Sequence, residues 1–225
     1  IAEGRVAING QTLVPPAVTV TDADMVVVDG VPLPGPDPAR LWRYHKPPGL
    51  MTTHRDPRGR PTVFEALPSG LPRVVSVGRL DFNSEGLLLL TNDGGLARTM
   101  ELPATGWTRR YRVRAFGAVD SAALARLAKG ITVDGIHYGP IRADLDSDKA
   151  QARDSRTRTP PKRGLEKRST GNVWLTVALN EGKNREVRLV LEHLGLTVSR
   201  LIRVAYGPFQ LGNLEQGEVE EVPRK

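Results

Sequence analysis

The strongest apolar run of the chain covers residues 87–91, four leucines followed by a threonine. Polar turn residues bound it on both sides, at residues 83–86 and 92–95. A short apolar run between two turns predicts a buried β-strand. Asp81 therefore lies on a loop that enters the core of a sheet. Its carboxylate must be hydrogen-bonded, ion-paired or chemically used, because burying it unpaired costs on the order of several kcal/mol.

Two further segments alternate between polar and apolar positions with period two, which predicts strands. In residues 109–117 the alternate arginines face water or RNA, whereas Tyr111 faces the core. Residues 198–204 alternate in the same way. Asn9-Gly10 predicts a hairpin turn. The remaining expected strands are residues 6–8, 18–20, 25–28, 40–46, 131–134, 141–145 and 173–179.

Helical signals predict four helices, at residues 62–67, 95–102 and 121–130 and within residues 180–195. Thr62 is the expected cap of the first helix, and Asn180 and Asn184 are both candidate caps of the last one. Gly195 ends the last helix. Its expected buried stripe is Val187, Val190, Leu191 and Leu194.

Two arginines, Arg185 and Arg188, project from the first turns of this last helix. Arginine pairs of this kind can hold a carboxylate or phosphates. A cation near a helix N-terminus opposes the helix dipole, so we expect these residues to have a tertiary or external partner.

A proline-rich segment divides the chain. Residues 31–38 hold four prolines in eight positions, which predicts a stiff, extended linker. We therefore expect a small β-rich domain at residues 1–34, a linker at residues 35–40 and a larger domain at residues 41–225.

A second segment, residues 146–171, has almost no apolar side chains. Between residues 153 and 168 it carries seven basic residues and two acidic ones. This composition predicts a flexible insertion between strands that contacts nucleic acid, with a solvated loop as the alternative.

Composition supports a polyanionic partner. The 225 residues include 32 Lys and Arg against 25 Asp and Glu, for a net charge of +7. Such an excess favours nucleic acid first and an anionic membrane surface second. The absence of cysteine excludes disulfides and thiolate metal sites. We expect no metal, because the four histidines have no metal-ligand spacing. No apolar run approaches the length that spans a bilayer, and no signal peptide is visible.

A basic loop follows the strand that ends at Lys46. It carries His54, Arg55, Arg58 and Arg60 among glycine and proline. Such a loop can grip phosphates, or it can be an ordinary solvated loop.

Several long motifs stand in fixed order along the chain: YHKPPGLMTT, GRLDFNSEGLLLLTNDG, RRYRV, NEGKNREVRLVLEHLGL and RLIRVAYGPFQLGNLEQGE. Together they closely resemble the ribosomal RNA pseudouridine synthases of the RsuA, RluB, RluE and RluF type, and the RluB type most of all. Residues 1–34 are similar to the C-terminal part of an S4 RNA-binding domain. Because the chain begins at Ile1, we expect the helical first half of that domain to lie upstream.

The resemblance implies an α+β pseudouridine synthase fold, with a mixed, mostly antiparallel central sheet, flanking helices and an RNA cleft. It implies that Asp81 is the catalytic carboxylate, that Tyr111 stacks on the target base and that Arg188 pairs with Asp81. The resemblance, together with the basic segments of the sequence, predicts six RNA-contacting residues: Lys46, Arg55, Arg58, Arg60, Arg79 and Arg185.

The implied reaction breaks the N1–C1′ bond of a uridine, turns the uracil and joins C5 to C1′. Nothing is added or lost, so no cofactor is expected. One ionised carboxylate near the sugar suffices, as nucleophile or as base. A hydrolytic glycosidase would need a second acid to activate water, and nothing in the sequence marks nearby Glu85 as one.

The resemblance favours an enzyme that modifies one uridine of 23S rRNA. The alternatives are a 16S rRNA enzyme, a non-catalytic RNA-binding or ribosome-assembly protein on the same fold, and a nucleoside glycosidase. It also implies a cytoplasmic monomer whose partner is ribosomal RNA and which has no membrane partner.

Overall fold

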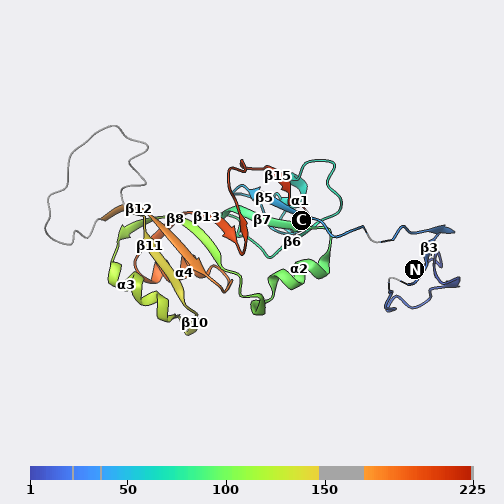
Figure 1. Cartoon of the computed structure of the whole chain (residues 1–225), viewed down its shortest axis with the longest axis horizontal. Coiled ribbons are helices and arrows are strands. Elements are labelled where there is room, and N and C mark those ends of the chain that lie inside the picture. Colours follow the sequence, from blue (N-terminus) through green and yellow to red (C-terminus); the bar gives the residue numbers. More distant parts are fainter. Residues whose placement is uncertain (22, 36, 147–169, 224–225) are drawn as a thin grey trace. The chain divides into compact units, whose positions relative to one another are not determined.

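The computed structural model describes residues 1–21, 23–35, 37–146 and 170–223 (Figure 1). The chain forms two compact units, Ile1–Ala39 and Arg40–Lys225. The boundary falls inside the predicted linker, where closely spaced prolines disfavour both helix and sheet.

The first unit is a small antiparallel sheet of two hairpins. Its strands are β1 (Val6–Ile8), β2 (Gln11–Thr12), β3 (Val26–Val28) and β4 (Val31–Pro32), in the order β2-β1-β3-β4. Asn9 and Asp29 have positive φ and are each followed by a positive-φ glycine, as tight hairpin turns require. The expected strand at residues 18–20 is wrong: Val18 and Val20 are exposed and pair with no described strand.

The second unit is built on a mixed sheet that has nine strands in the described residues. The main order is β11-β12-β8-β13-β7-β5-β15, and β14 and β6 pair with β13 and β7. Only the β13–β7 pair among these is parallel. The bounds are β5 (Leu41–Lys46), β6 (Val75–Val77), β7 (Glu85–Thr91), β8 (Arg109–Ala118), β11 (Ile141–Leu145), β12 (Thr170–Leu179), β13 (Thr197–Tyr206), β14 (Phe209–Gln210) and β15 (Val219–Glu221). The sheet confirms the predicted fold class.

Four α-helices flank the described sheet: α1 (Val63–Ala66), α2 (Gly94–Glu101), α3 (Ser121–Arg126) and α4 (Glu186–His193). Thr62 and Glu65 form a capping box that starts α1, as expected for Thr62. Short 3₁₀ turns follow α2 and α3, at Pro103–Thr105 and Leu127–Lys129. A separate hairpin of β9 (Ile131–Val133) and β10 (Ile136–Tyr138) precedes β11.

The start of α4 differs from the prediction. Neither Asn180 nor Asn184 caps the helix; Arg185 occupies the cap position in the left-handed conformation, with φ of 50°. The Glu186 carboxylate instead accepts a hydrogen bond from the Lys183 amide, 2.9 Å away. The helix therefore begins later than the sequence predicts, and the preceding residues form a loop.

Strand β7 separates two groups of core side chains, because successive residues of a strand point to opposite faces. Leu88 and Leu90 belong to the larger cluster, which also contains Tyr111 and the apolar stripe of α4. Leu87 and Leu89 belong to a smaller cluster with residues of α2. The strand is fully buried over all seven residues, which confirms its predicted position in the core. The central part of the predicted insertion lies outside the described residues.

Candidate active site

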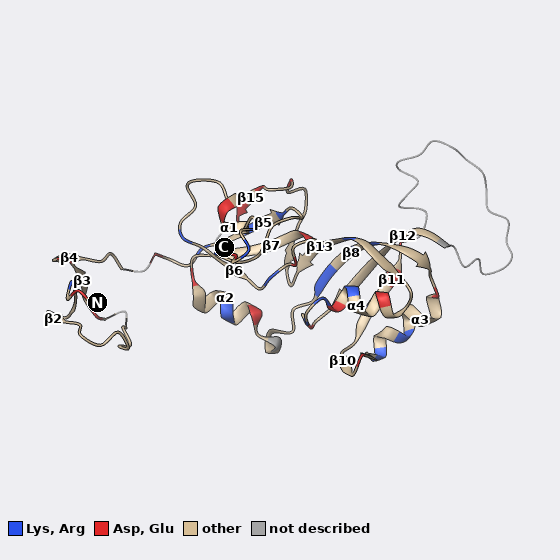
Figure 2. Ribbon diagram, turned by 180° about the vertical axis from the view of Figure 1, so that it is seen from behind, with Lys and Arg blue, Asp and Glu red and all other residues tan. Residues whose placement is uncertain are grey.

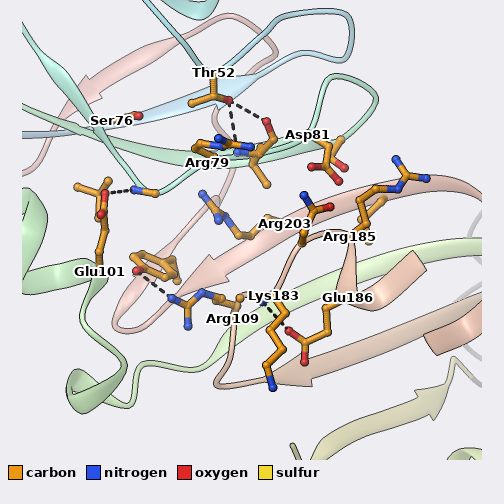
Figure 3. A pocket seen from close by; sticks show the side chains of 18 of the residues that line it. Thr52, Ser76, Arg79, Asp81, Glu101, Arg109, Lys183, Arg185, Glu186 and Arg203 are labelled. Atoms are coloured by element: carbon orange, nitrogen blue, oxygen red, sulfur yellow. Dashed lines mark hydrogen bonds between the residues drawn. The ribbon is translucent and has the colours of Figure 1, made fainter. Parts of the chain in front are cut away.

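A pocket of about 700 Å³ opens in the second unit, beside the loop between β6 and β7 (Figure 3). One wall is this loop, with Arg79 and Asp81, and another is the loop before α4, with Lys183 and Arg185. Strands β8 and β13 contribute Tyr111, Leu201 and Arg203. The pocket thus brings together segments that are more than 100 residues apart in the chain.

Lys46 fixes the loop that carries Asp81. Its side chain is fully buried, and its Nζ donates to the carbonyl oxygens of Pro47, Asp81, Phe82 and Ser84 at 2.8–3.4 Å. Burial lowers the pKa of Lys46 to about 8, opposed by the charges of Asp81 and Glu85. The predicted RNA contact at Lys46 is therefore wrong in this structure, because its ammonium group faces the protein interior.

Main-chain atoms on both sides of Asp81 are held in the same way. The Thr52 hydroxyl donates to the Leu80 carbonyl at 2.8 Å, and the Gly49 amide donates to the Phe82 carbonyl at 2.7 Å. The Glu101 carboxylate accepts from the Gly78 amide at 2.5 Å. Within the described residues the Asp81 carboxylate itself has neither a hydrogen bond nor an ion pair, although the side chain is partly buried. The first two explanations that the sequence leaves open, a hydrogen bond and an ion pair, therefore do not hold among the described residues.

Arg188 does not form the expected ion pair with Asp81. Its guanidinium donates to the carbonyl oxygens of Asn83 and Val198, each at 3.2 Å. Burial, followed by the charge of Arg185, lowers the pKa of Arg188, and the charge of Asp81 acts in the opposite direction. Arg188 thus supports the turn that carries Asp81 from outside the pocket.

Arg79 and Arg185 line the pocket with exposed side chains, so both positions suit contacts with a bound polyanion. Arg55 and Arg58 are also exposed, but neither lines the pocket. The Arg60 guanidinium already has a partner within the protein, since it forms an ion pair with Asp56 at 2.8 Å.

Tyr111 is buried and lines the pocket, as its place on the core side of β8 predicts. The alternate residues Arg110, Arg112 and Arg114 lie on the other face of the sheet and are exposed. The site therefore uses only one side of this strand, and blue segments mark basic residues along it in Figure 2.

Sequence reasoning missed Arg203. The residue is 3% exposed and lines the pocket. It lies between Leu201 and Ala205 on the buried side of β13. A charged residue at a buried position of a period-two strand is an unusual signal. The sequence shows this signal, because the alternation of residues 198–204 places Arg203 on the same side as Leu201.

As the sequence indicates, Glu85 is not placed as a second acid at the pocket. Glu85 is buried outside the pocket, where it pairs with both nitrogens of the Arg200 fork and accepts from Gln216 at 2.7 Å. Glu101 and Glu186 line the pocket. Both accept hydrogen bonds from backbone amides, and burial raises the pKa of Glu186. Each of these three glutamates therefore accepts hydrogen bonds from other groups of the protein.

Within the described ranges, no cluster of three acidic, histidine or cysteine side chains could hold a metal ion. In the same ranges no helix is both long and apolar enough to cross a membrane.

The buried ammonium of Lys46 predicts a pH-dependent stability. Between pH 8 and 10.5 the unfolded chain holds more protons at this residue than the folded chain, since folding lowers its pKa. Its contribution to the free energy of unfolding is therefore least favourable below pH 8 and rises towards pH 10.5. We expect the free energy of unfolding of the wild type, minus that of Lys46→Met, to rise by at most about 1.4 kcal/mol per pH unit there. Urea unfolding at several pH values measures this difference.

Lys129→Met is the matched control, because Lys129 is exposed. Its difference from the wild type should show no such rise between pH 8 and 9. A flat difference for Lys46→Met would contradict the proposed burial of the charge.

Comparison with families of known proteins gives one consistent match. The family model described as RNA pseudouridylate synthase matches residues 40–193. A solved structure described as a pseudouridylate synthase is similar in fold, with a TM-score of 0.65 and 24% identity, over 99% of this chain and 86% of the other.

Curated relatives agree. An uncharacterized RNA pseudouridine synthase of Rickettsia bellii is 47% identical over 225 residues, covering all of this chain and 89% of the relative. The ribosomal large subunit pseudouridine synthase B of Yersinia pestis is 38% identical over 217 residues, covering 94% of this chain and 62% of that protein.

Proposed function

The chain belongs to the RNA pseudouridylate synthase family, and from this premise we propose that it isomerises one uridine of 23S ribosomal RNA to pseudouridine, with Asp81 as the catalytic carboxylate. The proposal of a large-subunit substrate is supported by the likeness to the Yersinia pestis protein, whose name assigns it to that subunit. The net charge of +7 favours a polyanionic substrate.

The position of Asp81 carries the proposal. Its main chain is fixed by Lys46, while its carboxylate lines the pocket without a hydrogen bond or ion pair from any described residue. A group held this way is preorganised, because the loop need not rearrange when a substrate arrives. The pocket volume of about 700 Å³ is large enough for a nucleotide.

A stacked or paired uridine must leave its neighbours before it can enter such a pocket. Tyr111 is the aromatic residue of β8 that lines the pocket, so its ring can stack on the extruded base. Stacking of this kind contributes about 1–3 kcal/mol per base and offsets part of the extrusion cost. Arg79 and Arg185 line the pocket with exposed side chains that no described carboxylate pairs with, so both can bind phosphates there.

The chemistry then needs only residues of the chain. Asp81 acts at the sugar, either by bonding to C1′ or by removing the C2′ proton. The N1–C1′ bond breaks and the uracil turns. C5 then bonds to C1′, and in the same stage either the Asp81–C1′ bond breaks or Asp81 returns its proton to C2′. C5 finally loses its proton, and N1 gains one. The S4-like unit at residues 1–39 would add affinity for RNA outside the pocket.

Purified protein incubated separately with unmodified 23S and 16S rRNA tests this function. We expect one new pseudouridine in 23S rRNA, mapped by carbodiimide labelling and primer extension, and none in 16S rRNA. Modification of 16S rRNA alone would establish the alternative substrate. Binding without modification of either RNA would support a ribosome-assembly protein instead.

A further inference from the structure

Arg203 is a buried cation without a counter-ion. Its Nε donates to the Leu87 carbonyl at 2.7 Å, and its Nη2 is buried and has no partner among the described residues. Its guanidinium lies 5.2 Å from the centre of the Tyr206 ring and interacts with the Tyr111 side chain. No described carboxylate forms an ion pair with it.

Such an arrangement opposes folding. A buried charge costs several kcal/mol, on the order given for ions in real proteins, unless opposite charge or hydrogen bonds compensate it. Burial accordingly lowers the pKa of Arg203, with Tyr111 acting in the opposite direction. A cation that is buried at a pocket and has no described carboxylate partner suits a bound group that carries or develops negative charge.

The other cations of the pocket are engaged or solvated. Arg109 donates to the carbonyls of Trp107 and Asn180 and to the Tyr206 hydroxyl. Lys183 is exposed and pairs with Glu181 at 2.8 Å. Arg203 alone among the described cations lining the pocket is buried (Figure 3).

The proposed reaction produces a negative charge that Asp81 cannot stabilise. When N1–C1′ breaks, its electron pair stays on N1, and the charge spreads over N1, O2 and O4 of the uracil. C1′ is left short of an electron pair. An Asp81 oxygen supplies this pair by bonding to C1′, or the electrons of the C2′–H bond supply it after Asp81 has taken that proton. The departing base is therefore an anion in a pocket that already holds a carboxylate.

We propose that Arg203 is a second catalytic residue, which stabilises the uracil anion while the base is detached from the sugar. This inference rests on the proposed function. Tyr111 and Arg203 occupy paired positions on β8 and β13, so a base stacked on the tyrosine lies next to the guanidinium. A cation in a site that excludes water is worth far more to a developing charge than the same cation in water.

The test compares Arg203→Gln with Arg203→Lys, and uses Arg114→Gln as a matched control from the exposed face of β8. Single-turnover rates are measured with saturating RNA that contains the mapped uridine. We expect Arg203→Gln to lose about 10²- to 10³-fold in rate, the range seen for loss of one charge-stabilising donor. The Kd for RNA should change less than about threefold. Arg203→Lys, which keeps a cation, should lose less, and the control should match the wild type.

A second arm replaces the target uridine by 5-fluorouridine. Fluorine withdraws electrons and stabilises the base anion, so a variant that lacks Arg203 should be less impaired on this RNA. We expect the rate loss of Arg203→Gln, measured as consumption of the N-linked nucleoside, to be at least about threefold smaller than with uridine. A residue that merely supports the fold would not distinguish the two bases.

Thermal unfolding separates a structural role from a catalytic one. Since no described carboxylate pairs with the buried charge, Arg203→Gln should keep or raise the midpoint of unfolding. Equal rate losses on both bases, or a wild-type rate, would overturn the role of Arg203. If wild-type protein modified no RNA, the proposed function itself would be at fault.

Discussion

Asp81→Asn is expected to reduce pseudouridine formation at least about 10⁴-fold, the scale found when a central catalytic group is removed. Asparagine has nearly the same shape, but its neutral amide can neither bond to C1′ as a nucleophile nor take the C2′ proton. The main-chain contacts of the loop, including the Lys46 bond to the Asp81 carbonyl, do not involve the altered group. The variant should therefore fold and bind RNA as the wild type does.

Single-turnover conversion and filter binding measure the two effects separately. Asp144→Asn is the matched control, because Asp144 is an exposed carboxylate whose one ion pair among the described residues is with Arg142 on its own strand. It should retain full activity. An Asp81→Asn variant with the wild-type rate would remove Asp81 from the mechanism, whereas loss of both binding and folding would point to a structural role.

Gly86→Ala is expected to lower the free energy of unfolding by about 3–5 kcal/mol, from backbone strain and overpacking together. Gly86 has φ of 106°, which side chains rarely adopt, and an added Cβ would lie 2.3 Å from the Arg203 carbonyl oxygen. The obstructing atoms belong to the backbone of β13, so relief requires that β7 and β13 separate. The same shift would displace Arg203, so activity should fall with stability.

Gly70→Ala controls for the conformational part of this effect. Gly70 has the same φ of 106°, but an added Cβ meets nothing within 4 Å. Its cost should be only that of the strained backbone, about 1–3 kcal/mol. Urea unfolding of the two variants measures the difference. Equal costs would show that the close approach of β7 and β13 does not determine stability at Gly86.

Local signals identified most of the elements correctly. Period-two alternation predicted β8 and β13, because a strand that buries one face has apolar residues at every second position. The apolar run after the turn predicted β7. The sequence does not determine where α4 starts, since Asn180 and Asn184 are both of a residue type that caps helices. The structure instead uses a loop that delivers Arg185 to the pocket and lets Glu186 bind the Lys183 amide.

In the candidate site, too, some residues were predicted correctly from the sequence and others were not. Asp81 and Tyr111 were found from motifs, and the structure brings both to one pocket. Lys46 and Arg188 were assigned to RNA and to Asp81, yet both bind carbonyl oxygens of the loop that carries Asp81. A cation in a motif gives no indication of whether its partner is a carbonyl, a carboxylate or a phosphate.

The sequence by itself determined the family resemblance, most strands of the central sheet and the carboxylate that we propose acts on the uridine, since each depends on residues close together in the chain. Tertiary structure decided which charges are buried and what they contact. Arg203 and Tyr111 become neighbours only when β13 pairs with β8, and Gly86 matters because β7 lies parallel to β13. Burial and long-range pairing set the electrostatics of a site, and both depend on how distant strands pack.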